Sequence, residues 1–167
     1  TSLGRDRIAD LYGPGDVLGL AALDGGDHAE TVQAVHESCL TPLDPQQAMN
    51  DRNLRDYVLQ SFARQLRRSR EMLNEAEMPV GARVTRAFLR LAHQFGQPSD
   101  ETQGALKLPL ALTHEDLADL TGSSRVTITR ILGELRSDGA LEGTRGVYVA
   151  NPAALEQATD DYVMQVL

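Results

Sequence analysis

The chain has 167 residues, a formal charge of −8 and 41% hydrophobic residues, which suits one good-sized domain or two small ones with a packed core. Its single cysteine, Cys39, excludes an intrachain disulfide, a CxxC redox pair and an all-cysteine metal site within this sequence. No apolar run reaches membrane-spanning length, so we expect no membrane association and a protein of the reducing cytoplasm.

The first fifty residues carry the turn signals of a β-rich segment. Gly13-Pro14-Gly15-Asp16 and Asp24-Gly25-Gly26-Asp27 separate short apolar runs, a pattern that predicts short strands and hairpins. These runs cover residues 8–12, 17–23, 31–35 and 39–43. Residues 1–50 also hold eight acidic and two basic residues, so much of the negative charge lies here. Because the chain begins at Thr1 and enters such a run at once, we expect it to be part of a longer protein.

From residue 50 to residue 78 the pattern becomes helical. No Gly or Pro interrupts it, and apolar or small residues recur every three or four positions over seven turns. We expect this narrow stripe to pack against its own copy in a homodimer, with an ordinary surface helix on a monomer as the alternative. The predicted dimer-interface residues are Leu54, Val58, Phe62, Leu66, Ser69 and Leu73.

Pro79 and Gly81 end this helix, and a second helix is predicted over residues 82–95. Residues 97–105 are expected to form a loop. Alternating leucines predict a short strand over residues 106–112.

Residues 113–135 have the spacing of a helix-turn-helix. Thr113 and Asp116 predict a reciprocal N-terminal cap, and Gly122 suits a left-handed helix end. Ala118 is small where two helices must cross, and Ile128 supplies a buried side chain on the second helix. Since both helices then lock at a fixed angle, the spacing predicts a DNA-binding motif.

The second helix of this motif directs a polar face outward. At 100° per residue, Arg125, Val126, Thr129 and Arg130 lie opposite the aliphatic residues, where a major groove would lie. Arginine is the commonest reader of guanine, although exposed arginines are often only solvated charges. Hydroxyl groups near the helix start can bind phosphates. The predicted DNA-contacting residues are Thr113, Ser123, Ser124, Arg125, Val126, Thr127, Thr129, Arg130 and Arg145.

Residues 140–149 predict a hairpin whose turn spans residues 143–146 and carries Arg145. A strand before the motif and a hairpin after it make a winged helix. We therefore divide the chain into residues 1–49, a dimerisation helix over 50–78, a winged-helix domain over 79–150 and a helical tail over 151–167. A winged helix that binds protein instead of DNA is the alternative, but it would favour apolar residues where the arginines stand.

Residues 113–149 resemble the winged-helix domain of CRP/FNR bacterial transcription regulators. The run from Leu117 to Leu132, LADLTGSSRVTITRIL, is similar to the signature of that family, and Gly15-Asp16-Val17-Leu18-Gly19 resembles a turn of its N-terminal β-roll. Residues 50–78 resemble its dimerisation helix. The resemblance implies an α+β fold in which a partial β-roll, a long helix and a winged helix follow one another.

The resemblance also implies a homodimer that reads a two-fold operator in double-stranded DNA and contacts RNA polymerase. It assigns guanine reading to Arg125 and Arg130. The family often has Glu between them, where this sequence has Val126, so a different operator is expected.

Cyclic-nucleotide members of the family use a Gly-Glu pair and an Arg-Ser or Arg-Thr pair. Here Leu20 follows Gly19, His28-Ala29 stand near the second pair, and residues 8–51 contain no Arg or Lys. A buried phosphate would lack a compensating cation, so we expect no cyclic nucleotide.

Other chemistries are poorly supported. The Gly13–Gly19 run departs from a dinucleotide fingerprint, because its last glycine is one residue late and no helix follows. The possible metal ligands of the first segment have no firm spacing, and no nucleophile motif is present. We expect no enzyme activity, no cofactor and no metal. Those possible ligands are Asp24, Asp27, His28, His36 and Cys39.

Overall fold

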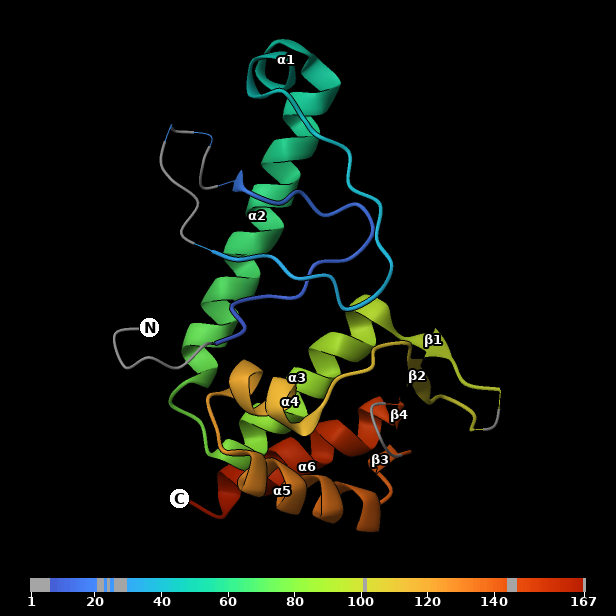
Figure 1. Cartoon of the computed structure of the whole chain (residues 1–167). Coiled ribbons are helices and arrows are strands. Elements are labelled where there is room, and N and C mark those ends of the chain that lie inside the picture. The colour runs from blue at the N-terminus through green and yellow to red at the C-terminus, as the bar shows by residue number, and fades with distance from the viewer. Residues whose placement is uncertain are drawn as a thin grey trace. The chain divides into compact units, whose positions relative to one another are not determined.

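The computed structural model describes residues 7–20, 23, 25, 30–100, 102–143 and 147–166. The chain forms two compact units. The long-helix unit is Tyr12–Leu73, and the winged-helix unit is Asn74–Leu167 together with Thr1–Leu11. Figure 1 shows the elements of both units, and each unit is described separately below.

The long-helix unit is built on α2 (Arg52–Glu75), which follows the short helix α1 (Pro45–Asn50). Asp51 has an extended backbone between them, and its carboxylate accepts hydrogen bonds from the amides of Asn53 and Leu54 at 2.8 and 3.0 Å. The helix predicted over residues 50–78 is therefore wrong at its boundaries, since it runs over Arg52–Glu75. The Asp51 side chain accounts for the later start, because it caps a new helix.

The strands predicted within residues 8–43 do not form in the described part of that range. Residues 15–17 bond instead to side chains of α2. The hydroxyl of Tyr57 donates to the carbonyl of Gly15, Ser61 Oγ accepts from the Val17 amide at 3.3 Å, and Gln65 Nε2 donates to the Val17 carbonyl at 2.6 Å. At Gly15 and Val17, main-chain groups with side-chain partners need no β-ladder.

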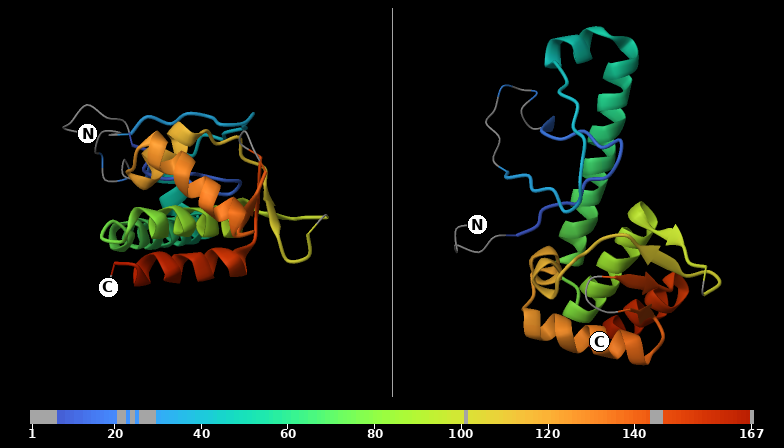
Figure 2. Two further views of the ribbon diagram at one scale, coloured as in Figure 1. Left: turned by 90° about the horizontal axis from the view of Figure 1, so that it is seen from below. Right: turned by 45° about the vertical axis from the view of Figure 1, so that its right-hand side comes forward.

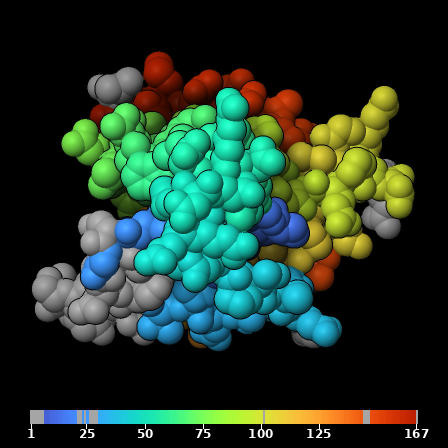
Figure 3. Space-filling model, turned by 90° about the horizontal axis from the view of Figure 1, so that it is seen from above, coloured from blue at the N-terminus to red at the C-terminus, as the bar shows by residue number. Residues whose placement is uncertain are grey.

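A small apolar core holds this unit together. Leu20, Ala48 and Val58 are buried in it, and Val17 and Leu54 pack against its edge. Figure 3 looks onto the α1 end of the unit, where the atoms around α1 face the viewer. Because Val58 is only 2% exposed, this predicted interface residue already packs within its own chain.

In the winged-helix unit, α3 (Val80–Phe95) and α6 (Pro152–Met164) pack along each other (Figure 2). Val84 and Phe88 of α3 are completely buried. The hydroxyls of Thr85 and Thr159 join the two helices by a hydrogen bond of 2.7 Å. The helix predicted over 82–95 and the helical tail predicted after residue 150 both form.

A four-stranded antiparallel sheet in the order β1-β2-β4-β3 completes this unit. Tyr148 pairs with Leu108 across two of its strands, and the Tyr148 ring meets Phe88 edge-on with 5.2 Å between ring centroids. The strands are β1 (Gln97–Pro98), β2 (Leu106–Leu108), β3 (Leu141–Glu142) and β4 (Tyr148–Ala150).

The predicted hairpin corresponds to β3 and β4, and the predicted strand over 106–112 is shorter than expected. The expected loop over 97–105 contributes β1, a two-residue edge strand that contains Pro98 and gives no periodic signal. The predicted α+β fold class is confirmed. Among the described residues, no helix has the length and apolar character needed to cross a membrane.

Candidate nucleic-acid interface

The first helix of the motif, α4 (His114–Thr121), begins and ends as its sequence predicts. The Thr113 hydroxyl accepts from the Asp116 amide at 3.1 Å, and the Asp116 carboxylate accepts from the Thr113 amide at 2.7 Å. Gly122 ends the helix in the left-handed region with a φ of 63°, and the Ser123 amide then donates to the Ala118 carbonyl at 2.9 Å. These contacts fix the tight turn that leads into the second helix.

The second helix, α5 (Arg125–Ser137), has one apolar face and one exposed face. Ser124 caps it by accepting from the Thr127 amide at 3.1 Å, and its hydroxyl also lies 2.8 Å from that of Thr127. Four aliphatic side chains are completely buried: Ile128, Ile131, Leu132 and Leu135. On the opposite face Val126 is 81% exposed. Arg125, Thr129 and Arg130 are exposed beside it, so the predicted outward face is confirmed as a surface.

Thr129 links the outward face of α5 to the start of α4. Its hydroxyl donates to the Arg125 carbonyl at 2.9 Å and lies 2.8 Å from Nδ1 of His114. His114 is not among the site residues predicted from the sequence, where its only signal is its place directly after the capping residue Thr113. The contact joins both helices at the surface that would face DNA.

Arg130 forms an ion pair with Glu134, one helical turn further along α5. The Arg130 side chain is 62% exposed and that of Glu134 is 39% exposed. Glu134 therefore binds one edge of the Arg130 guanidinium, and the rest of this largely exposed side chain stays accessible.

Arg83 is a second residue that sequence reasoning missed. Its guanidinium donates to the carbonyls of Thr121 and Gly122 in the turn of the motif, at 3.1 and 3.4 Å. It also donates to the carbonyls of Ala76 and Met78, just after α2, at 3.3 and 3.2 Å. One side chain of α3 thus joins the segment after the long helix to the helix-turn-helix, and no local sequence pattern marks such a contact.

The start of the wing is anchored to α5. The Arg136 Nε donates to the carbonyl of Gly143 at 2.9 Å, where the wing leaves β3. Gly143 has a φ of 89°, and an added β-carbon would overlap the Val147 carbonyl, so only glycine fits there. Arg145, predicted at the wing tip, lies outside the described residues.

The stripe predicted for dimerisation divides between two faces of α2. Leu54 and Val58 face the core of their own unit. Phe62, Leu66 and Leu73 are 51, 43 and 71% exposed, and Leu59, not in the prediction, is 54% exposed. Ser69 is also exposed. These five exposed residues, Leu59, Phe62, Leu66, Ser69 and Leu73, are called the α2 stripe below.

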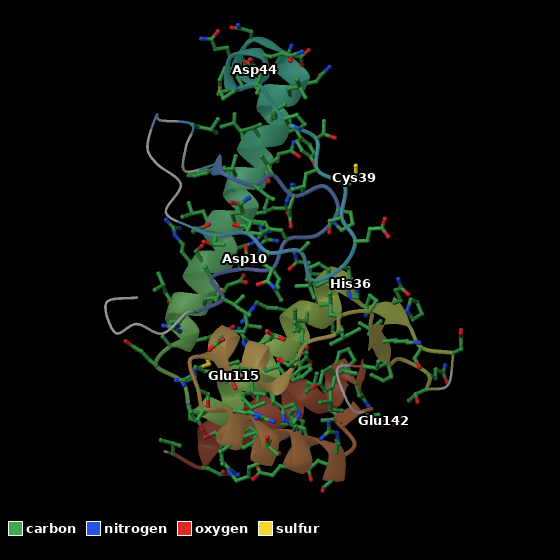
Figure 4. The ribbon with its side chains drawn as sticks, in the orientation of Figure 1. Asp10, His36, Cys39, Asp44, Glu115 and Glu142 are labelled. Atoms are coloured by element: carbon green, nitrogen blue, oxygen red, sulfur yellow. The ribbon has the colours of Figure 1, made fainter. Side chains whose placement is uncertain are left out.

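Among the described residues, no three His, Cys, Asp or Glu side chains are placed together to hold a metal ion. Cys39 is a free, exposed thiol, and Figure 4 shows it apart from His36 on the same segment. Asp24, Asp27 and His28 lie outside the described residues. In the same figure Glu115 marks the first turn of α4, beside the candidate interface.

The winged helix and the exposed cationic face of α5 together define a DNA-binding transcription regulator. Residues 123–136 hold three arginines and one glutamate, in a chain whose total charge is −8. The hydroxyls and amides at the N-terminus of α5 add donors suited to a phosphate. Cations are therefore concentrated where a duplex would lie, despite the acidic composition.

Comparison with known proteins agrees with this class. Residues 82–158 match the Crp-like helix-turn-helix domain. Transcriptional regulator LdrP of Thermus thermophilus is 35% identical over 148 residues, which are 86% of this chain and 72% of that protein. A CRP-like cAMP-activated global transcriptional regulator of Mycobacterium tuberculosis is 30% identical over 148 residues, 84% of this chain and 65% of that protein.

A solved structure shows the same fold. A CRP/FNR-family transcriptional regulator from Thermus thermophilus superposes with a TM-score of 0.74 at 24% identity, covering 92% of this chain and 77% of that one. The chain belongs to the CRP/FNR family of transcription regulators. The resemblance predicted from residues 113–149 is confirmed.

Proposed function

We propose that the chain acts as a homodimer on a two-fold operator, with one α5 helix in the major groove of each half-site. The observation that carries this proposal is the exposed face of α5, where Arg125, Val126 and Arg130 project opposite four completely buried aliphatic residues. Helix-turn-helix dimers place their recognition helices about 34 Å apart, one turn of DNA. The half-sites should have this separation.

Each outward residue has a chemical role in this proposal. Arg125 and Arg130 present paired donors to O6 and N7 of guanine. Val126 offers an apolar contact to a thymine methyl group. Ser123, Ser124, Thr127 and Thr113 lie near the helix starts and bind phosphate oxygens, as does Arg145 from the wing. Thr129 reaches a base edge when DNA replaces its contact with His114.

The α2 stripe is the proposed dimer seam. Its exposed apolar side chains recur at helical spacing along one edge of α2. A second copy of α2 would bury them, and because the same patch faces itself, the contact has two-fold symmetry. Leu54 and Val58 are not part of this seam, because they pack in the core of their own unit and hold α2 there.

The regulator is proposed to work without a cyclic nucleotide, another cofactor or enzymatic activity. Residues 8–51 supply no Arg or Lys for a cyclic phosphate, and Arg68 of α2 lies 3.4 Å from the Asp16 carboxylate. The M. tuberculosis relative is described as cAMP-activated, so this is a difference within the family. As for the family at large, the DNA-bound dimer is expected to contact RNA polymerase in the cytoplasm.

Selection of bound duplexes from a random pool, followed by binding titrations at several salt concentrations, tests the proposal. We expect a two-fold sequence, and the logarithm of the binding constant should fall linearly with log[salt], because phosphate contacts release counterions. Arg125→Ala should cost about 1–3 kcal/mol and relax preference at one base pair per half-site. Equal losses on all sequences would make Arg125 a phosphate contact. Added cyclic AMP should leave both affinity and preference unchanged.

A further inference from the structure

A side chain from outside the helix-turn-helix reaches the recognition helix. Tyr162 of α6 donates from its hydroxyl to Oε2 of Glu134 at 2.6 Å. The other carboxylate oxygen of Glu134, Oε1, binds the Nη1 of Arg130. The three residues therefore form a hydrogen-bonded network that runs from Tyr162 of α6, through the Glu134 carboxylate, to the guanidinium of Arg130 on the proposed base-reading face.

Tyr162, the first residue of this network, is held by packing against α3. The ring of Tyr162 packs on the backbone of Gly81 in α3, so α3 sets the direction of the hydroxyl. Burial raises the pKa of Tyr162, and the hydrogen bond to the Glu134 carboxylate raises it further. The phenol therefore stays protonated and remains a donor at physiological pH.

Glu134, the second residue of the network, is consequently bound on both of its carboxylate oxygens. An exposed Glu–Arg pair one turn apart contributes little, because fixing two long side chains costs conformational entropy and water screens the charges. Glu134 differs from such a pair, since its second oxygen is bound by a residue of another helix. The Arg130 side chain then loses less conformational entropy when it binds a base, because Glu134 already orients one edge of its guanidinium. Guanine reading needs two donors, and the guanidinium carries five.

We propose that Glu134 and Tyr162 are positioning residues for Arg130, which hold its guanidinium at one edge so that the remaining donors meet guanine in a fixed geometry. This inference rests on the proposed function, in which Arg130 reads a base. Neither residue was expected to act in DNA recognition, and Tyr162 lies in the helical tail, after the winged helix.

The test compares Tyr162→Phe with the matched control Tyr148→Phe in the full chain. Both variants lose one phenolic hydroxyl of the same unit, but the Tyr148 hydroxyl is buried without a hydrogen-bond partner among the described residues. Arg130→Ala first identifies the base pair that Arg130 reads, on the selected operator and its single-base variants. Tyr162→Phe should then reduce discrimination at that base pair about threefold to tenfold, the range of one hydrogen bond.

Three further readouts separate positioning from a structural role. Glu134→Gln keeps the side-chain shape and should relax the same base pair, whereas Tyr148→Phe should not. The salt dependence of Tyr162→Phe should match that of the parent, because no phosphate contact is lost. Adding Tyr162→Phe to Arg130→Ala should cause no further loss of discrimination.

The possible results are distinguishable. If Arg130→Ala relaxes one base pair but Tyr162→Phe and Glu134→Gln leave it unchanged, the positioning role is overturned and the proposed function stands. If Arg130→Ala relaxes no base pair, base reading by Arg130 is overturned and the positioning role with it. Equal relaxation at every position by Tyr162→Phe would indicate a structural effect and also overturn the inference.

Discussion

The aromatic ring of Tyr162 occupies the space that a side chain at Gly81 would need. A β-carbon built on Gly81 would overlap three ring carbons of Tyr162, whereas one built on Gly133 would meet no atom within 4 Å. Both glycines lie within helices, at positions where alanine would ordinarily be preferred. Gly81 is therefore required by the close approach of α6 to α3, and Gly133 is not required by packing.

The two glycines should respond to alanine with opposite signs. Gly81→Ala should destabilise the protein by about 1–3 kcal/mol, because the ring must move out of a well-packed site. Gly133→Ala should stabilise it by about 0.5–1 kcal/mol through helix propensity alone. Urea unfolding followed by circular dichroism measures both. Stabilisation by both substitutions would show that Tyr162 does not hold the position described.

Removal of the Arg83 guanidinium should weaken the winged-helix unit. Arg83→Met keeps much of the side-chain length but leaves the carbonyls of Thr121 and Met78 without their charged donor. Hydrogen bonds to charged groups contribute about 1.5–3 kcal/mol, and the free energy of unfolding should fall by that amount. DNA affinity should fall as well, since Thr121 lies in the turn of the motif. Arg67→Met, at an exposed position of α2, is the control and should change stability by less than about 0.5 kcal/mol.

The helix-turn-helix could be predicted because its determinants are local. The cap at Thr113 joins residues three positions apart, and Gly122 stops α4 by its own backbone conformation. The buried face of α5 follows from a period of 3.6 residues, which needs no knowledge of what covers it. Short-range chemistry of this kind can be read directly from consecutive residues.

The remaining features depend on contacts between distant segments. Arg83 meets Thr121, and Tyr162 meets Glu134, across 38 and 28 residues of sequence. A charged residue in a helix looks the same in sequence whether it binds solvent or a distant carbonyl. Likewise, the apolar stripe of α2 does not reveal that Val58 packs inward while Phe62 stays exposed, because both fit one helical period.

Disruption of the α2 stripe should give monomers. Leu66→Glu places a charge where two copies of α2 would meet, and a desolvated, unpaired carboxylate is strongly unfavourable there. Light scattering should show half the parent mass, and operator affinity should drop because two half-sites are no longer bound together. Gln60→Glu, also exposed on α2 but outside the stripe, should leave the mass unchanged. A Leu66→Glu dimer would exclude the stripe as the seam.

Alkaline pH should destabilise the parent more than Tyr162→Phe. The pKa of Tyr162 is raised in the folded protein, chiefly by burial and next by its bond to Glu134, so the unfolded chain loses this proton first. The stabilisation is fully present below the unfolded value of about 10 and is lost as the pH rises above it. Unfolding free energies at about pH 9 and about pH 10.5 measure the difference. Parallel declines in parent and variant would contradict the raised pKa.

Val126→Glu should change which base pair is preferred. Val126 is the most exposed apolar residue of α5 and stands between the two proposed guanine readers, so its side chain is placed to reach a base edge. A carboxylate accepts from N4 of cytosine, whereas valine favours a thymine methyl group. Glutamate should therefore shift preference at one position from T·A to C·G by about 1–3 kcal/mol, measured by selection and by competition between the two duplexes. Val126→Gln is the control for shape, because it adds length without charge and pairs best with adenine. A uniform loss of affinity in Val126→Glu, with preference unchanged, would mean that this side chain faces the phosphate backbone.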